Sequence, residues 1–211
     1  MSTKDFIQTQ IEAAYKRIDS IGGETEPFVI APPATIESLS NLERELDSPI
    51  PPGLRNFALE VSGRVFFDWQ MPDDYELPDE FDEIFCGGFD FDISKLPDHE
   101  NGRLSWQREC FPDPSDSYDA IWHNKFAFHH VQNGDYIALD EQGKVVYLSH
   151  DDGEGHGRVM ADSFSDLITR WFPLGCPGPE DWQWLPFASS PKSKINSDSP
   201  AATRWLQVFP D

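Results

Sequence analysis

Basic side chains are scarce in this sequence. It has 16 lysines and arginines against 38 aspartates and glutamates, which gives a formal net charge of −22. Proteins that bind nucleic acid present a cationic surface to the phosphates, so this balance argues against a nucleic-acid partner. It argues equally against docking on anionic lipid. A charge of this sign would instead attract cationic partners toward the protein.

Cysteine is scarce as well. The three residues, Cys86, Cys110 and Cys176, are odd in number and form no CxxC pair. This pattern fits a reducing compartment better than the disulfide framework of a secreted domain, so we expect a cytoplasmic protein. No finger-like Cys/His spacing supports a zinc site.

Long hydrophobic runs are missing. No segment approaches the roughly 20 apolar residues that span a bilayer. The first 20 residues contain no unbroken apolar core of the kind found in a signal peptide. We therefore expect no membrane partner.

The common cofactor and catalytic motifs are absent. The sequence contains neither GxxxxGK[ST] nor GxGxxG, and HExxH and GxSxG are missing too. The alternate glycines of residues 153–157 lie among acidic residues, which would repel a phosphate. We expect no cofactor and no catalytic residue in this chain.

Helical periodicity is present in the first third of the chain. Ile7, Ile11, Ala14 and Ile18 share one face of a helix. A threonine cap, prolines and glycines place the ends of the next two helices. The expected helices cover residues 3–21, 35–48 and 51–62.

Strand patterns follow these helices. Alternating and β-branched residues predict strands over residues 65–69, 83–91, 126–131, 135–140, 144–150 and 158–160, the second of them broken at Gly87–Gly88. Glu141–Gln142–Gly143 forms the turn of a hairpin. Short helices are expected at 104–110 and after the cap residue Ser163. Helices first and strands afterwards predict an α+β fold, with helices packed on one face of a mostly antiparallel or mixed sheet.

The length of 211 residues suits one large domain, expected over residues 1–188. The last stretch, residues 189–211, is rich in serine, proline, lysine and aspartate at its start. We expect it to be a mobile tail with a short helix at 203–209.

Acidic residues concentrate between Asp68 and Asp119. That segment has sixteen acidic residues against three basic ones, and aromatic residues are interleaved with them. Apolar anchors ringed by charge suit a protein-binding surface, although the same aromatics could equally belong to the core. We predict partner binding by the acids of the first loop in the segment: Asp73, Asp74, Glu76, Asp79, Glu80, Asp82 and Glu83.

The sequence HDDGEGH, at residues 150–156, allows a metal site as an alternative to a solvated turn. Carboxylates could bind Ca²⁺, and His150 with His156 could bind a transition metal. The spacing is not that of an EF-hand, so we interpret the segment as a loop and expect no metal.

Three stretches together resemble the SUKH superfamily, the Smi/Knr-type cell-wall-assembly-regulator domain. They are IESLSNLERELDSPIPPGLRNFALEVSG (36–63), NGDYIALDEQGKVVYLSHDDGEGH (133–156) and VMADSFSDLITRWFPLGCPGPEDWQWLPF (159–187). The resemblance spans about residues 33–187, with an acidic insertion at about 70–120.

The resemblance implies helices against a sheet and a binding module rather than an enzyme. Many bacterial members look like immunity proteins that neutralise a toxin, often a nuclease, and fungal relatives act in cell-wall regulation. Four residues match recurring positions and are interpreted as structural: Gly134, Asp135, Ser163 and Phe164.

We therefore expect a non-enzymatic protein that binds a cognate basic toxin, a nuclease for example, through an acidic surface. The alternatives are a regulatory or scaffold protein of the cell-wall-regulator type and, least favoured, a metal-dependent hydrolase that uses His150, Asp152 and His156.

Overall fold

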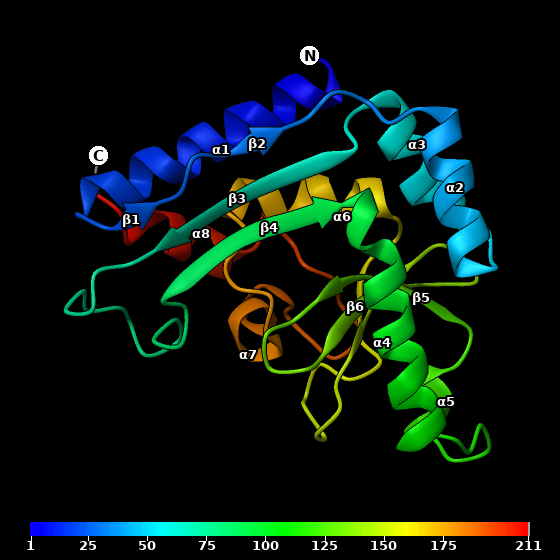
Figure 1. Cartoon of the computed structure of the whole chain (residues 1–211). Coiled ribbons are helices and arrows are strands. Elements are labelled where there is room, and N and C mark those ends of the chain that lie inside the picture. Colours follow the sequence, from blue (N-terminus) through cyan, green and yellow to red (C-terminus); the bar gives the residue numbers. More distant parts are fainter. Residues whose placement is uncertain (211) are drawn as a thin grey trace.

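The computed structural model describes residues 1–210 and has an α+β fold in which every strand pair is antiparallel, as predicted (Figure 1). The helices are α1 Thr3–Ser20, α2 Ile36–Leu46, α3 Pro52–Glu60, α4 Leu96–Glu109, α5 Asp119–Trp122, α6 Phe164–Trp171, α7 Asp181–Trp184 and α8 Pro200–Gln207. The 3-10 helices are η1 Ile93–Lys95, η2 Phe172–Leu174 and η3 Leu185–Phe187. Within residues 1–210, no helix is both long and apolar enough to cross a membrane.

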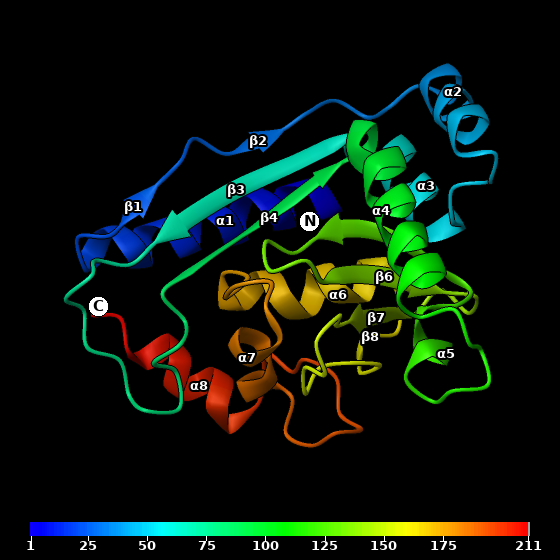
Figure 2. The same cartoon turned by 60° about the horizontal axis from the view of Figure 1, so that its bottom comes forward.

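The strands form two sheets rather than the single sheet expected. In the first, β3 pairs with β4 along one edge and with β1 and β2 on the other; the second has the order β5-β6-β7-β8. Figure 2 shows the two sheets side by side, with β4 facing the second sheet. The strands are β1 Glu24–Thr25, β2 Val29–Ile30, β3 Arg64–Gln70, β4 Cys86–Asp92, β5 Lys125–His130, β6 Tyr136–Asp140, β7 Val145–Leu148 and β8 Val159–Ala161.

Strand β4 runs through Gly87–Gly88, where the sequence predicted a break. Gly87 lies so close to Trp69 that a Cβ atom would be 2.3 Å from the indole ring and 2.4 Å from the Cys176 carbonyl oxygen. The glycine therefore permits a close approach between β4 and its neighbours instead of ending the strand. The Trp69 indole donates a hydrogen bond of 2.7 Å to the Gly175 carbonyl in the same region.

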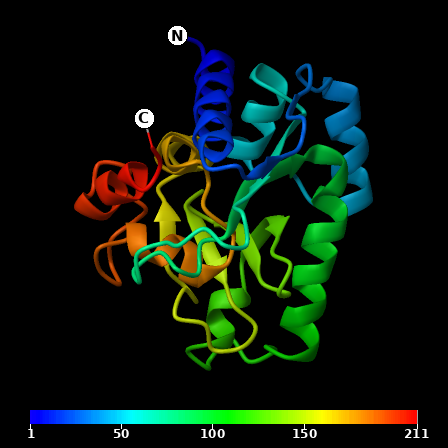
Figure 3. The same ribbon diagram turned by 90° about the vertical axis from the view of Figure 1, so that its left-hand side faces the viewer.

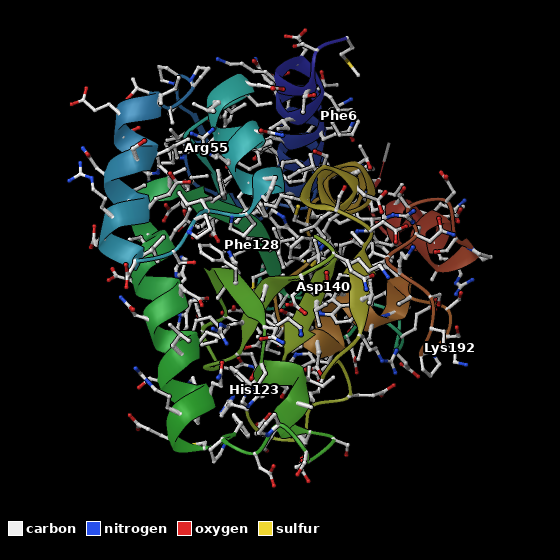
Figure 4. All side chains as sticks on the ribbon, turned by 90° about the vertical axis from the view of Figure 1, so that its right-hand side faces the viewer. Phe6, Arg55, His123, Phe128, Asp140 and Lys192 are labelled. Carbon is white, nitrogen blue, oxygen red and sulfur yellow. The ribbon has the colours of Figure 1, made fainter. Side chains whose placement is uncertain are left out.

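The second sheet is covered on both faces, whereas the sequence suggested one. Phe128 and Tyr147 belong to the main core, and Phe128 packs edge-to-face on Phe164 of α6. Ala138 and Leu148 face the opposite way, into a smaller cluster around Trp122. Figure 4 shows Phe128 deep among the packed side chains. Burial on both faces explains why β6 and β7 are apolar at nearly every position.

Helix α4 begins at Leu96, eight residues before the predicted start at 104. The face it buries carries Glu100 and Arg103, which form an ion pair of 2.6 Å. Glu100 also accepts the Ala127 backbone N–H at an irregularity in β5, and Arg103 donates to the Trp122 carbonyl. A helix that buries charged residues shows no apolar stripe, so periodicity alone missed its first half.

The acidic segment predicted as an insertion at 70–120 is mostly integral to the fold. Residues 71–85 and 110–118 form loops, whereas β4 and α4 between them belong to the sheet and its cover. Asp68, at the start of the acid-rich segment, lies in β3.

The C-terminal segment is not the mobile tail that we expected. Ile195 and Trp205 are buried, and the Trp205 indole donates a hydrogen bond of 2.8 Å to the Leu174 carbonyl. Helix α8 begins three residues before the predicted position and packs against η2 and η3 (Figure 3). Residues 195–209 thus contribute side chains to the same core as the rest of the chain.

Candidate partner-binding site

The loop between β3 and β4, residues 71–85, is hereafter called the acidic loop. Its two ends meet, because the Met71 N–H donates a hydrogen bond of 2.8 Å to the Phe85 carbonyl. All seven predicted partner-binding acids project from this loop into solvent: Asp73, Asp74, Glu76, Asp79, Glu80, Asp82 and Glu83. All seven are therefore exposed on one loop.

Apolar side chains hold the acidic loop against the body. Phe81 is 1% exposed, stacks on Phe187 at 5.8 Å between ring centroids and packs edge-to-face on Trp205 at 5.5 Å. Ile84 is fully buried, and the Tyr75 hydroxyl donates to the Val208 carbonyl. These contacts give the exposed carboxylates a defined scaffold, as is typical of a compact loop packed by its own side chains.

One of the seven acids has a cation of its own. Arg204 of α8 donates two hydrogen bonds to Glu80, from Nε to Oε1 at 2.6 Å and from Nη2 to Oε2 at 2.7 Å. Hydrogen bonding to this guanidinium lowers the pKa of the Glu80 carboxyl. The other six acids form no ion pair with residues 1–210, so their charges are directed to solvent.

A groove of about 400 Å³ adjoins the acidic loop. Phe85, the last residue of the loop, is 53% exposed and lies on its wall. The lining comes from β3 and β4, from η1 and α4, from β5 and the residues after it, and from α7 and the segment before it. These lining residues are Phe66, Phe67, Asp68, Phe85, Cys86, Gly87, Gly88, Phe89, Asp90, Lys95, His99, His129, His130, Gln132, Pro179, Glu180 and Gln183.

The groove is anionic. Asp90 pairs with Lys95, but Asp68 and Glu180 have no cationic partner within residues 1–210. Burial raises the pKa of both unpaired carboxyls, and nearby acids add to the effect: Glu26 for Asp68, and Asp135, Asp181 and Glu83 for Glu180. An arriving cation would relieve this repulsion.

The histidines of the groove are held neutral. Burial, with the neighbouring His129 and His130, lowers the pKa of His99 to about 4. Burial also lowers the pKa of His129, whose Nδ1 lies 3.2 Å from the Asp90 carbonyl oxygen. These rings therefore add no positive charge near neutral pH.

Asp135 organises the hairpin that the sequence singled out. Its carboxylate is 1% exposed; Oδ1 accepts from the His150 N–H at 2.8 Å and lies 2.6 Å from His150 Nδ1. Oδ2 accepts from the Tyr147 hydroxyl at 2.7 Å and from the Asn133 amide at 3.0 Å. Four donor groups from three residues satisfy this buried carboxylate, so its geometry is that of a structural residue.

The three residues of the alternative metal site do not converge. His156 stacks on Tyr118 at 3.7 Å between ring centroids, while His150 is bound to Asp135 and Asp152 is exposed. The cluster with metal-like spacing in the part of the chain described is Asp135, His150 and Asp151, whose ligand atoms lie within 4.8 Å of one another. A cation there would have to displace hydrogen bonds that Asp135 already makes.

The other motif residues have the structural roles inferred for them. Gly134 adopts φ +103°, which favours glycine. Ser163 caps α6 by accepting the Asp166 N–H at 3.0 Å, and Phe164 is fully buried.

Several groove residues were not recognised from the sequence. Phe85, Asp68 and Glu180 come from three separate segments that only the fold brings together. The one local signal was the Gly87–Gly88 pair, because glycine inside a strand often marks a close approach of another chain segment.

The fold and site define an α+β protein that exposes an acid-rich loop beside an anionic groove. The family model described as SMI1 / KNR4 family (SUKH-1) matches residues 33–170, and the chain belongs to this family. The match includes the acidic loop but neither α1 nor α8, which pack into the same core. No curated protein matches the chain.

Proposed function

We propose that this protein is a non-enzymatic immunity protein that binds a cognate basic toxin through the acidic loop. The observation that carries the proposal is the exposure of seven acids on one anchored loop, six of them without an ion-pair partner in residues 1–210. Family membership supports a binding domain of this type.

The expected mechanism is occlusion. The acidic loop approaches the cationic surface that a toxin such as a nuclease uses to hold its substrate, and its carboxylates take the place of phosphates. Long-range attraction accelerates encounter, because a net charge of −22 meets an oppositely charged partner. The rigid anchoring of the loop reduces the ordering cost of binding.

A second candidate is a regulatory or scaffold module of the cell-wall-regulator type. Membership of the SMI1 / KNR4 family is compatible with this candidate as well. Genomic context separates the two: a toxin gene directly beside this one supports immunity, and an isolated gene supports regulation. The three free cysteines support action in the cytoplasm under either proposal.

Co-expression tests the immunity proposal. The neighbouring toxin is expressed in a heterologous host with this protein or with the quadruple variant Asp73→Asn, Asp74→Asn, Glu76→Gln, Asp79→Asn. We expect the unmodified protein to restore growth and the variant to protect less well. Failure of the unmodified protein to bind any product of a neighbouring gene would contradict the immunity proposal.

A further inference from the structure

The edge of β4 that faces the groove is incompletely paired. The Met71 N–H donates to the Phe85 carbonyl, and the Ile93 N–H donates to the Gly63 carbonyl. Between residues 85 and 93, the odd-numbered residues therefore point their backbone groups at β3. By the two-residue repeat of a strand, the backbone groups of Cys86, Gly88 and Asp90 point the other way, toward the second sheet.

Some of these outward groups are already engaged. The Gly88 N–H donates to the Cys176 carbonyl at 2.9 Å, and the Cys86 carbonyl accepts from Gly178 at 3.0 Å. The Asp90 carbonyl lies 3.2 Å from His129 Nδ1. The Gly88 carbonyl and the Asp90 N–H remain without a partner within residues 1–210.

The side chain of Asp90 presents a further unpaired acceptor. Its Oδ2 binds Lys95, but Oδ1 is buried and receives no hydrogen bond within residues 1–210. A buried acceptor without a donor is costly, and native structures rarely leave one unsatisfied. A ligand with a hydrogen-bond donor in the groove would therefore bind more favourably by donating to Asp90 Oδ1.

We infer that the groove binds an extended, lysine- or arginine-containing segment of the protein partner, which adds to the free edge of β4 as a short parallel strand. The inference rests on the proposed partner binding and specifies which part of the partner is held. In a parallel pair, one residue of the added strand donates its N–H to a backbone carbonyl of the neighbouring strand. The carbonyl of that same residue accepts the N–H that lies two residues further along the neighbouring strand. The Gly88 carbonyl and the Asp90 N–H, on either side of Phe89, have this relationship.

Charge selects the occupant. Asp68 and Glu180 line the groove without a cation, and both have neighbouring acids that oppose their ionised forms. A basic side chain on the added strand relieves this repulsion, whereas an acidic one increases it. Phe85, exposed at the wall, offers an apolar contact for the neighbouring side chain. Main-chain pairing supplies affinity and the side-chain contacts supply specificity, as in other cases of strand addition.

A peptide titration followed by NMR tests the inference. The probe is an N-acetylated, C-amidated peptide of alternating lysine and threonine, about eight residues long. The comparison peptides replace lysine by glutamate, or methylate alternate backbone nitrogens. We expect the lysine peptide to shift the amide signals of residues 85–90 and 129–132 and to slow hydrogen exchange at the Asp90 N–H. We expect both comparison peptides to bind at least tenfold more weakly, a loss of about 1.4 kcal/mol.

Variants separate the groove from the acidic loop. Asp68→Asn with Glu180→Gln should weaken binding of the lysine peptide about tenfold, since two partly exposed ion pairs are lost. The matched control, Asp73→Asn with Glu76→Gln, removes the same charge from the acidic loop and should leave the mapped signals in place. Circular dichroism melting verifies that both double variants fold.

Each outcome decides the inference. Signal changes mapping outside the groove, an unprotected Asp90 amide, or equal binding of the methylated peptide would overturn it. If the peptide fails but a toxin still binds with an affinity that depends on the acidic loop, strand addition is wrong and the proposed function stands. If the peptide binds as described but no toxin does, the groove is a peptide site and the immunity proposal fails.

Discussion

Arg204 and Glu80 are 124 positions apart and form a two-pronged ion pair that fastens helix α8 to the acidic loop. Arg204→Gln should therefore raise the pKa of Glu80 toward its ordinary value, because the hydrogen-bonded cation is gone. NMR titration of the side-chain carboxyl measures this change. The stabilisation from the pair is present above the ordinary pKa and is lost as the pH falls through the lowered one. A Glu80 pKa unaffected by the substitution would mean that the pair does not persist in solution.

The aromatic anchor of the loop should dominate its stability. Phe81→Ala removes a ring that is 1% exposed, and we expect a loss of about 3–5 kcal/mol in the free energy of unfolding. Phe85→Ala is the matched control, since Phe85 is 53% exposed and its loss should cost under about 1 kcal/mol. Urea unfolding measures both. Similar losses for the two variants would contradict the packing described for the loop.

Asp135 should be essential for the hairpin. Asp135→Asn keeps the shape but weakens the interactions with Tyr147 and His150, and we expect a loss of about 3 kcal/mol. Asp151→Asn changes a neighbouring exposed carboxylate and should stay within about 0.5 kcal/mol of the unmodified protein. Thermal melting compares the two, and equal effects would refute the central role of Asp135.

The hydrogen bonds to Asp135 predict that added metal ions do not stabilise the protein. Because Asp135 already accepts from four groups, Ca²⁺, Zn²⁺ and Mn²⁺ should leave the melting temperature unchanged relative to a chelator. Differential scanning calorimetry makes the comparison. A metal-dependent rise that Asp135→Asn abolishes would restore the metal-dependent hydrolase as a candidate.

His99 should make the fold sensitive to mild acid. Its pKa falls from 6.5 to about 4 on folding, so the unfolded chain binds the proton more readily. The resulting stability is complete above pH 6.5 and declines as the pH falls toward 4. The free energy of unfolding of His99→Asn should vary less over this interval than that of the unmodified protein. An unchanged pH dependence would show that His99 is accessible to protons in the folded state.

The sequence revealed the local structure better than its assembly. The apolar stripes of α1 to α3, the hairpin of β6 and β7, and the cap at Ser163 are encoded within a few turns of chain, so periodicity predicted them. The first half of α4 was missed because Glu100 and Arg103 are buried as an ion pair. The C-terminal helix is short, and its burial depends on distant residues such as Leu174.

The candidate site divides in the same way. The exposure of the seven acids followed from their density in one segment between two predicted strands. The groove could not be predicted, because it requires β4 and β5, strands of two different sheets, to lie beside each other. A hydrogen bond links them at the groove, from the His129 ring to the Asp90 carbonyl, and joins residues 39 positions apart.

The most direct test is the rate at which this protein associates with its cognate toxin, measured by stopped-flow fluorescence from about 50 to 500 mM NaCl. Two variants are compared, one with Asp73, Asp74, Glu76 and Asp79 replaced by their amides, the other with the exposed acids Glu12, Glu37, Glu45 and Glu141 replaced likewise. The account predicts a rate that falls steeply with salt and falls about tenfold or more at low salt in the first variant, with a smaller change in the second. A rate that ignores salt, or that responds equally to both sets of substitutions, would contradict a partner-binding role for the acidic loop.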